Sequence, residues 1–125
     1  MKKEVGYWLI YGVIGVDSRE KLRVIKSIIT ETAKKYNIKI FRIILFGSRA
    51  RGDYTEDSDW DILLVTEESI DRTTKRRFLV ESRRRIIRII NDPIDIIMID
   101  RRHYEEYKNI YGDIAGIAEL EGVTI

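Results

Sequence analysis

The chain of 125 residues contains no cysteine, one proline and one histidine. The absence of cysteine excludes a disulfide framework, a thiolate nucleophile and a cysteine-ligated zinc site. The single histidine, His103, likewise excludes any site built from several imidazoles. Chemistry in this chain must therefore rely on carboxylates, hydroxyls, guanidinium groups and the backbone.

Neither positive nor negative charge is in clear excess. The chain has 23 Lys and Arg and 21 Asp and Glu, which give a formal net charge of +2. Phosphate contacts need a basic excess, so this near-balance argues against a nucleic-acid partner. Basic residues do concentrate at 75–77 and 83–88. We interpret them as the solvated face of a helix, with a basic patch for RNA or an acidic protein surface as the alternative.

Long hydrophobic runs are also missing. The apolar stretch Val5–Val16 has about twelve residues, whereas a membrane span needs about 20. Lys2 and Lys3 precede the stretch, but Glu4 and the lack of a small-residue cleavage site argue against a secretory signal. We therefore predict a cytoplasmic protein with no membrane contact, in which this stretch forms a buried strand or docks on a partner.

Alternating helical and strand-like segments predict one compact α/β domain over residues 1–125. Apolar residues at helical spacing predict a helix capped by Asp17, a second capped by Asp71, and one last helix between Asp100 and Gly122. The nearly continuous apolar run Ile38–Phe46 is typical of a strand covered on both faces. The predicted strands are Ile38–Phe46, Asp59–Val65 and Ile94–Ile99.

A pair of carboxylates stands at the start of the second predicted strand, in the sequence Asp59-Trp60-Asp61. Because side chains alternate along a strand, the two aspartates point to one face, about 7 Å apart. Carboxylates at that spacing can share divalent cations. An isolated Asp-x-Asp more often serves as a cap or a solvated strand end, so the pair needs support from its surroundings.

Gly47-Ser48 supplies that support, because it ends the preceding strand and only ten residues separate Ser48 from Asp59. A glycine there allows a positive φ and a close backbone approach to a ligand. The serine hydroxyl and the two backbone N–H groups suit a phosphate. Together with the paired acids, the turn predicts a site that holds a metal-bound triphosphate for in-line displacement.

A third acid from a neighbouring strand would complete such a site, and Asp92, Asp95 and Asp100 are the candidates. Asp92 precedes Pro93 in a predicted turn, and Asp100 fits a helix cap. Asp95 lies inside an otherwise apolar strand, where burial of a lone carboxylate is costly without a partner. We therefore favour Asp95, with shared metal ions as its partner.

The segment GSRARGDYTEDSDWD resembles the signature of the DNA polymerase β-like nucleotidyltransferase superfamily, and more narrowly its minimal nucleotidyltransferase group. With Asp95 and the closing AELEGVTI, the resemblance extends over most of Asp17–Ile125, but it leaves residues 1–16 unexplained. It implies a mixed central sheet flanked by helices. It also implies transfer of a nucleoside monophosphate, AMP from ATP, with two Mg²⁺ ions or with Mn²⁺.

The resemblance assigns roles to individual residues of this chain. It implies that Asp59, Asp61 and Asp95 are the catalytic residues and the metal ligands, with Asp95 helping to deprotonate the attacking hydroxyl. The implied nucleotide-binding residues are Gly47, Ser48, Arg49 and Arg51, and for the two arginines a solvent-facing position is the alternative.

The expected length of the chain indicates what kind of molecule accepts the nucleoside monophosphate. Because it ends at Ile125, we expect no further domain to grip an acceptor, so that a second protein presents it. The resemblance implies that this partner is a toxin with a HEPN domain, which is often the partner in the minimal group, and that the transferase neutralises it as an antitoxin. The alternatives are a non-catalytic antitoxin or regulatory module that masks its partner, and a homodimeric transferase acting on a small molecule.

Overall fold

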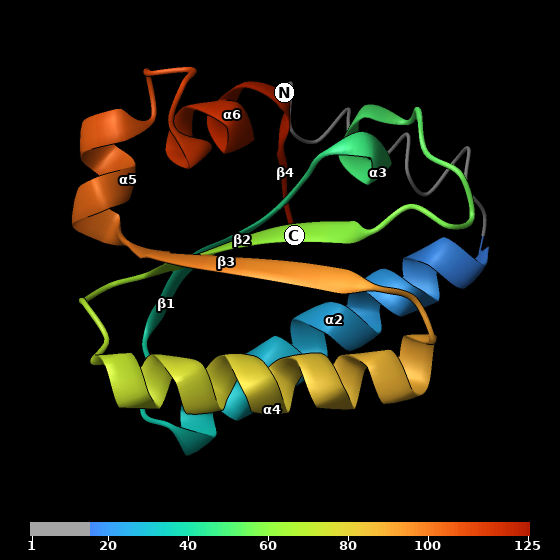
Figure 1. Ribbon diagram of the computed structural model, residues 1–125, viewed down its shortest axis with the longest axis horizontal. Coiled ribbons are helices and arrows are strands. Elements are labelled where there is room, and N and C mark those ends of the chain that lie inside the picture. The colour runs from blue at the N-terminus through green and yellow to red at the C-terminus, as the bar shows by residue number, and fades with distance from the viewer. Residues whose placement is uncertain (1–15) are drawn as a thin grey trace.

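The computed structural model describes residues 16–125, in which helices lie on both faces of a four-stranded sheet (Figure 1). The strand order is β3-β2-β1-β4, with β1 antiparallel to β2 and β4, and β2 parallel to β3. The predicted mixed sheet flanked by helices is therefore confirmed. The elements are α2 (Val16–Lys35), β1 (Ile40–Phe46), α3 (Ser48–Arg51), β2 (Trp60–Thr66), α4 (Arg72–Ile90), β3 (Ile94–Asp100), α5 (Arg101–Tyr107), α6 (Ile114–Glu121) and β4 (Val123–Thr124).

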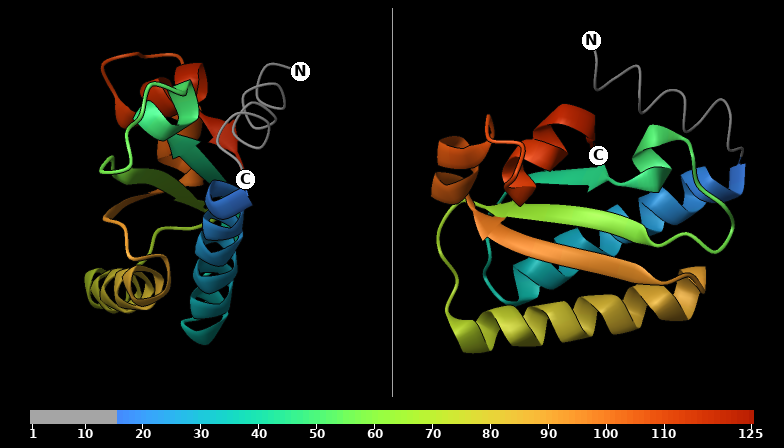
Figure 2. Two further views of the ribbon diagram at one scale, coloured as in Figure 1. Left: turned by 90° about the vertical axis from the view of Figure 1, so that its right-hand side faces the viewer. Right: turned by 45° about the horizontal axis from the view of Figure 1, so that its top comes forward.

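The larger part of the core lies between the sheet and helices α2 and α4, which cover the same face (Figure 2). Trp60, Ile62 and Leu64 point from β2 into this layer and are fully buried. Phe78 and Ile86 meet them from α4. Burial of such side chains contributes about 1.5–3 kcal/mol each, which makes this layer the main source of stability.

The opposite face of the sheet is covered at one end by α5 and α6. Leu63 and Val65 of β2 pack there with Tyr104 of α5. Because side chains alternate along β2, Asp61 shares this face with them but lies at the other end. There the side chains are more accessible, and Asp95 of β3 is 52% exposed. The fold thus leaves the acidic end of one sheet face open.

The structure corrects the prediction of one last helix, because α5 and α6 are separated by a connector at 108–113. The side chain of Asp113 caps α6. The connector folds back so closely that a Cβ on Gly116 would lie 1.9 Å from the backbone oxygen of Ile110. Helical spacing of the apolar residues continues through the connector, so the pattern alone did not reveal the break.

Two predicted helix caps are confirmed, since Asp71 accepts a hydrogen bond from the backbone N–H of Thr74 and Asp100 from that of His103. Helix α2 already includes Val16, so it begins before the predicted cap at Asp17. The rest of the predicted Val5–Val16 segment lies outside the described residues. Within residues 16–125, no helix is both long and apolar enough to cross a membrane.

Candidate active site

Gly47 connects β1 to α3 and lies directly against the carboxylate of Asp61. Its backbone has φ +75° and ψ −162°, a region that is essentially reserved for glycine. A Cβ at this position would lie 2.3 Å from Oδ2 of Asp61. The register of β1 and β2, which pairs Phe46 with Asp61, produces this approach. The Gly-Ser turn and the aspartate pair therefore lie side by side in one site.

Parallel pairing of β2 and β3 places Asp95 directly beside Asp61. Paired residues of neighbouring strands point to the same face, about 5 Å apart. Asp59, one residue before β2, is exposed at the same end of the sheet. The three acids predicted as catalytic residues and metal ligands are thus brought to one sheet end, next to Gly47.

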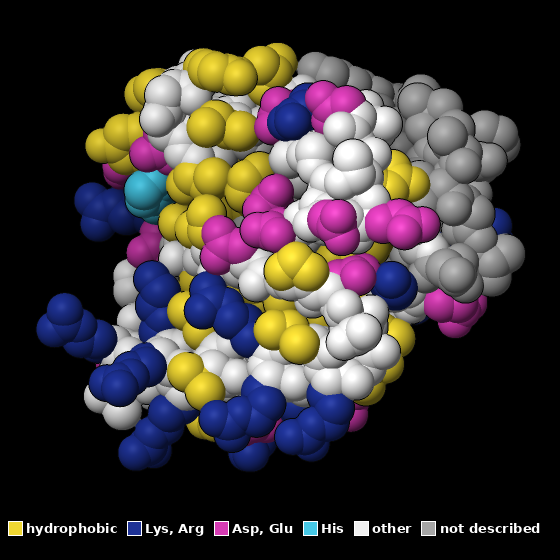
Figure 3. Space-filling model, turned by 45° about the vertical axis from the view of Figure 1, so that its right-hand side comes forward, with side chains coloured by type: hydrophobic (Ala, Val, Ile, Leu, Met, Phe, Trp, Pro, Cys, Tyr) yellow, Lys and Arg dark blue, Asp and Glu magenta, His cyan; other side chains and the backbone are white. Residues whose placement is uncertain are grey.

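The electrostatics of Asp61 reflect this crowding. Partial burial raises the pKa of its carboxyl, and the carboxylates of Asp59 and Asp95 raise it further. Glu121, at the end of α6, also raises this pKa, whereas Arg51 lowers it. The carboxylates of Asp59, Asp95 and Glu121 therefore all repel that of Asp61, and Arg51 is the cation that opposes them there. A bound metal ion would relieve this repulsion. In Figure 3, acidic side chains gather between an apolar area and the Lys and Arg side chains.

We expect the Asp61→Asn variant, without metal, to be more stable than the unchanged protein at neutral pH. Because folding raises the pKa of Asp61, the folded state binds this proton more tightly, and stability is lost as the pH rises through the folded-state pKa. The advantage of the variant should shrink at acidic pH, where the carboxyl is protonated. Thermal unfolding from acidic to neutral pH measures the difference in stability between the variant and the unchanged protein. The control is Glu106→Gln, at an exposed position. Equal melting temperatures of Asp61→Asn and the unchanged protein at neutral pH would contradict electrostatic repulsion at Asp61.

The donor set fits a hard cation, because Mg²⁺ and Mn²⁺ prefer carboxylate oxygens. Asp59, Asp61 and Asp95 would hold such an ion. In the part of the chain that the structure describes, no three acidic or histidine side chains converge closely enough to ligate one ion as they stand. Binding would therefore require side-chain rotation at this sheet end.

Arg83 holds the carboxylate of Asp95. Its Nη2 donates to Oδ1 of Asp95 at 3.3 Å and to the backbone oxygen of Ile96 at 3.5 Å. The expectation that Asp95 is a buried carboxylate was wrong, because β3 is an edge strand and the side chain is half exposed. Its partner in this structure is an arginine that reaches around the sheet edge from α4.

The other two candidate acids have structural partners, as the sequence indicated. Asp92 accepts hydrogen bonds from the indole N–H of Trp60 at 3.0 Å and from the ammonium of Lys21 at 2.9 Å. Asp100 caps α5 and accepts a second hydrogen bond from the hydroxyl of Ser69. These contacts support the choice of Asp95, which alone of the three lies in register with Asp61.

Arg49 is buried, and its guanidinium binds the loop that leads to β2. It donates to the backbone oxygens of Ser58 and Glu56 and lies over the ring of Trp60 at 4.3 Å. Desolvation lowers the pKa of this guanidinium, although the carboxylate of Asp92 opposes the shift. In this arrangement Arg49 fixes the loop between Gly47 and Asp61, while its predicted role in nucleotide binding stays a prediction.

We expect Arg49→Ala to lower the free energy of unfolding by about 2–4 kcal/mol, since it leaves backbone oxygens without donors and removes packing on Trp60. Chemical denaturation measures the change. Arg51→Ala is the matched control, because its side chain is 43% exposed and its ion pairs contribute at most about 1 kcal/mol. Equal losses in the two variants would contradict the structural role of Arg49.

Arg51 lies at the open end of the sheet, where it pairs with Glu121 at 3.0 Å and Asp53 at 3.3 Å. Sequence reasoning missed Glu121 and Arg83 as neighbours of the acids. Glu121 belongs to the closing AELEGVTI segment, so the resemblance offered a signal for it. For Arg83 no signal existed, because it is one of several consecutive arginines and only tertiary packing selects it.

Comparison with known proteins agrees with this geometry. Two proteins of Methanocaldococcus jannaschii, each described as a candidate protein adenylyltransferase, match segments of the chain. One is 51% identical over 49 residues, covering 39% of this chain and 49% of its own. The other is 37% identical over 60 residues, covering 48% of this chain and 61% of its own. The chain thus matches about half to three fifths of these relatives.

A solved structure of a candidate nucleotidyltransferase from Sulfolobus solfataricus has a similar fold. Its TM-score is 0.51 at 26% identity, and the match covers 88% of this chain and 86% of the other. The model of the polymerase beta nucleotidyltransferase family matches residues 27–118, a span that includes Gly47 and all three acids. The chain therefore belongs to the polymerase β nucleotidyltransferase family.

Proposed function

We propose that this protein transfers AMP from ATP to a hydroxyl of a partner protein, with magnesium bound by Asp59, Asp61 and Asp95. The observation that carries the proposal is the pairing of Asp61 with Asp95 across two parallel strands, directly beside Gly47. Membership of the nucleotidyltransferase family supports the reaction class. The names of the two similar proteins support a protein as acceptor.

Different residues of the chain have different roles in this reaction. Gly47 leaves room for a triphosphate to approach the backbone. The backbone N–H groups of Gly47 and Ser48 and the hydroxyl of Ser48 donate to the oxygens of this triphosphate. Arg51 offers a guanidinium to the same phosphates when it leaves Glu121. Magnesium, when bound, neutralises phosphate charge and lowers the pKa of the attacking hydroxyl.

At phosphorus the step forms one bond and breaks one, and a proton leaves the acceptor hydroxyl. The acceptor oxygen bonds to the α-phosphorus of ATP, the bond from that phosphorus to the bridging oxygen breaks, and pyrophosphate leaves with the electron pair. In this proposal the hydroxyl proton passes to the carboxylate of Asp95, which is accessible on the edge strand. Release from Arg83 makes that carboxylate available.

Exposed apolar side chains on the α5–α6 side of the sheet, the side that also carries Asp61, favour a protein as the acceptor. Leu120 is 52% exposed and adjoins Glu121, which acts electrostatically on Asp61. Ile110 and Tyr111 in the α5–α6 connector are also exposed. Apolar surface next to a polar site is typical of protein contacts. We infer that the partner is a HEPN-domain toxin modified on a tyrosine, so that this protein acts as its antitoxin.

We expect the unchanged protein, co-expressed with this partner, to add AMP to it, and Asp59→Asn to abolish the addition. Loss of one carboxylate weakens the binding of magnesium and of the metal-bound triphosphate, while the fold persists because Asp59 is exposed. Intact-protein mass spectrometry of the partner detects the added AMP, and calorimetry with Mg-ATP detects the loss of binding.

The control is Asp57→Asn, which removes an exposed acid two residues away and should leave the modification unchanged. An unmodified partner that is nevertheless fully inhibited would favour the masking module. Transfer to a small molecule without any protein partner would favour the homodimeric enzyme. Equal Mg-ATP affinity in Asp59→Asn would show that the site is assigned wrongly.

A further inference from the structure

The small net charge of the chain conceals a strong separation of charge. Helix α4 (Arg72–Ile90) carries eight Lys and Arg and one acid, a net charge of +7. Because the whole chain has +2, the remaining residues sum to +2 − 7 = −5. Figure 3 shows many Lys and Arg side chains crowding the lower part of the surface, below a band of acidic side chains. The small net charge of the chain therefore does not prevent this helix from binding nucleic acid.

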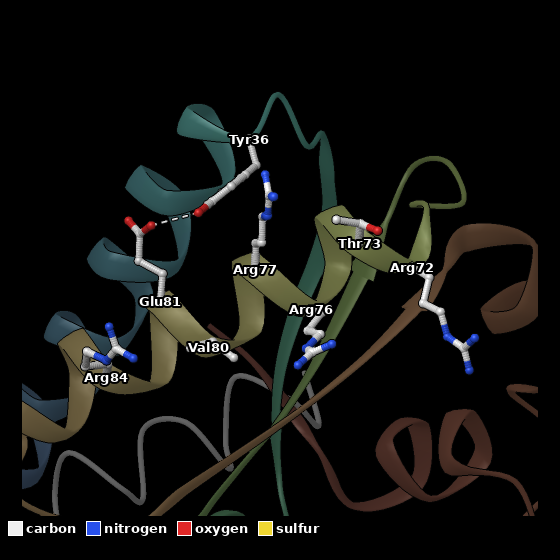
Figure 4. A pocket seen from close by; sticks show the side chains of 8 residues that line it. All are labelled: Tyr36, Arg72, Thr73, Arg76, Arg77, Val80, Glu81 and Arg84. Carbon is white, nitrogen blue, oxygen red and sulfur yellow. Dashed lines mark hydrogen bonds between the residues drawn. The ribbon is translucent and has the colours of Figure 1, made fainter.

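Four arginines of α4 share a hollow of about 630 Å³ beside the end of α2 (Figure 4). Two other arginines of α4 do have acidic partners, since Arg83 pairs with Asp95 and Arg85 lies 3.8 Å from Glu31. Among the described residues, the four in the hollow form no ion pair and are exposed; they are Arg72, Arg76, Arg77 and Arg84.

The acid that lines the hollow, Glu81, is already compensated. Its carboxylate accepts hydrogen bonds from the ammonium of Lys35 and the hydroxyl of Tyr36, both at 2.8 Å. The dashed line in Figure 4 marks the bond from Tyr36. Because this negative charge is neutralised from α2, the hollow presents unopposed positive charge to a ligand.

The placement of these cations is unfavourable for the helix itself. Helix N-termini carry a partial positive charge and favour acidic residues. Asp71 supplies an acid at the N-cap, but the first turn of α4 itself contains none, and Arg72, Lys75 and Arg76 lie within five residues. Arg72 and Arg76 also form a like-charge pair four residues apart, which opposes helix formation. Binding of an anionic ligand would offset this repulsion.

We propose that this arginine groove, lined by Arg72, Arg76, Arg77, Arg84, Tyr36 and Val80, binds single-stranded RNA through its phosphate groups. Arginine presents a planar fork that matches phosphate oxygens. Protein interfaces need an apolar centre, whereas nucleic-acid interfaces are more polar and more positively charged. Val80 is the one aliphatic side chain of the lining, so RNA fits better than an acidic protein.

A single strand suits this groove better than a duplex, because a flexible chain can follow a short concave surface. The site is also separate from the acids. It lies on α4 and α2, which cover the sheet face opposite to the one that carries Asp61 and Asp95. RNA binding by the groove is therefore independent of nucleotide transfer at the acids.

The test measures the anisotropy of a labelled twelve-residue oligouridylate between 50 and 200 mM salt. Four phosphate contacts on a single strand predict a slope of log K against log salt of about −2.8, or about 50-fold weaker binding at the higher salt. In the double variant Arg76→Gln/Arg84→Gln, the slope should fall to about −1.4 and the loss to about 7-fold.

The matched control is Arg23→Gln/Arg102→Gln, which removes the same charge from exposed positions outside the groove and should keep the full slope. Circular dichroism verifies that both variants fold. The Asp59→Asn variant should bind the RNA like the unchanged protein, whatever its transfer activity.

Three results would overturn the proposal. The first is an equal loss of RNA binding in the groove and control variants. The second is tighter binding of a deca-glutamate peptide, which would assign the groove to an acidic protein. The third is preference for a DNA strand or an RNA duplex of equal length over the single-stranded RNA.

Discussion

Asp95→Ala is expected to reduce AMP transfer by at least about 10³-fold while leaving Mg-ATP binding within a few-fold. In this variant Asp59 and Asp61 remain to hold the metal-bound triphosphate, whereas the exposed carboxylate of Asp95, which is proposed to receive the proton of the acceptor hydroxyl, is lost. Loss of one such group removes several kcal/mol of transition-state stabilisation, and each 1.36 kcal/mol is tenfold in rate. Single-turnover transfer, measured beside calorimetric ATP binding, separates the two effects.

Two further variants sharpen this test. Asp100→Asn alters a helix cap and should change stability without this loss of rate. Arg83→Gln removes the partner of Asp95, and it should leave transfer within tenfold while changing its dependence on magnesium concentration. Undiminished single-turnover transfer in Asp95→Ala would make Asp95 structural and would refute its proposed role.

Gly47→Ala is expected to abolish Mg-ATP binding and to lower the free energy of unfolding by about 1–3 kcal/mol from backbone strain alone. The φ of +75° is unfavourable for alanine, and its Cβ would meet the carboxylate of Asp61 at 2.3 Å. That contact forces Asp61 or the turn to move, so the site is lost together with stability. Chemical denaturation and calorimetry measure the two losses.

Other glycines of the chain separate strain from contact. Gly52 has φ +90° with open space where a Cβ would lie, so Gly52→Ala should lose stability but keep ATP binding. Gly112 has open space and no positive φ, so Gly112→Ala should change neither. If Gly47→Ala bound Mg-ATP as well as Gly52→Ala, the close approach of Gly47 to Asp61 would have no functional importance.

Local patterns in the sequence were sufficient to predict most elements. The strands around Ile44 and Leu63 are long apolar runs, and the structure buries residues of both strands on both faces of the sheet. The caps at Asp71 and Asp100 also depend on nearby residues alone, so they are readable from the chain. Gly47, Ser48 and the Asp59–Asp61 pair belong to one continuous motif, which is why they could be proposed together.

Tertiary structure decided what depends on contacts between distant segments. Asp95 faces Asp61 because β3 pairs in parallel with β2, and it is exposed because β3 is an edge strand. Apolar residues around Asp95 predicted burial, since a pattern cannot distinguish an edge from a centre. The same limit applies to the break before α6, to Arg83 at the acids and to the arginine groove of α4. Composition averages charge over the chain, whereas only folding decides which charges meet and which remain unpaired.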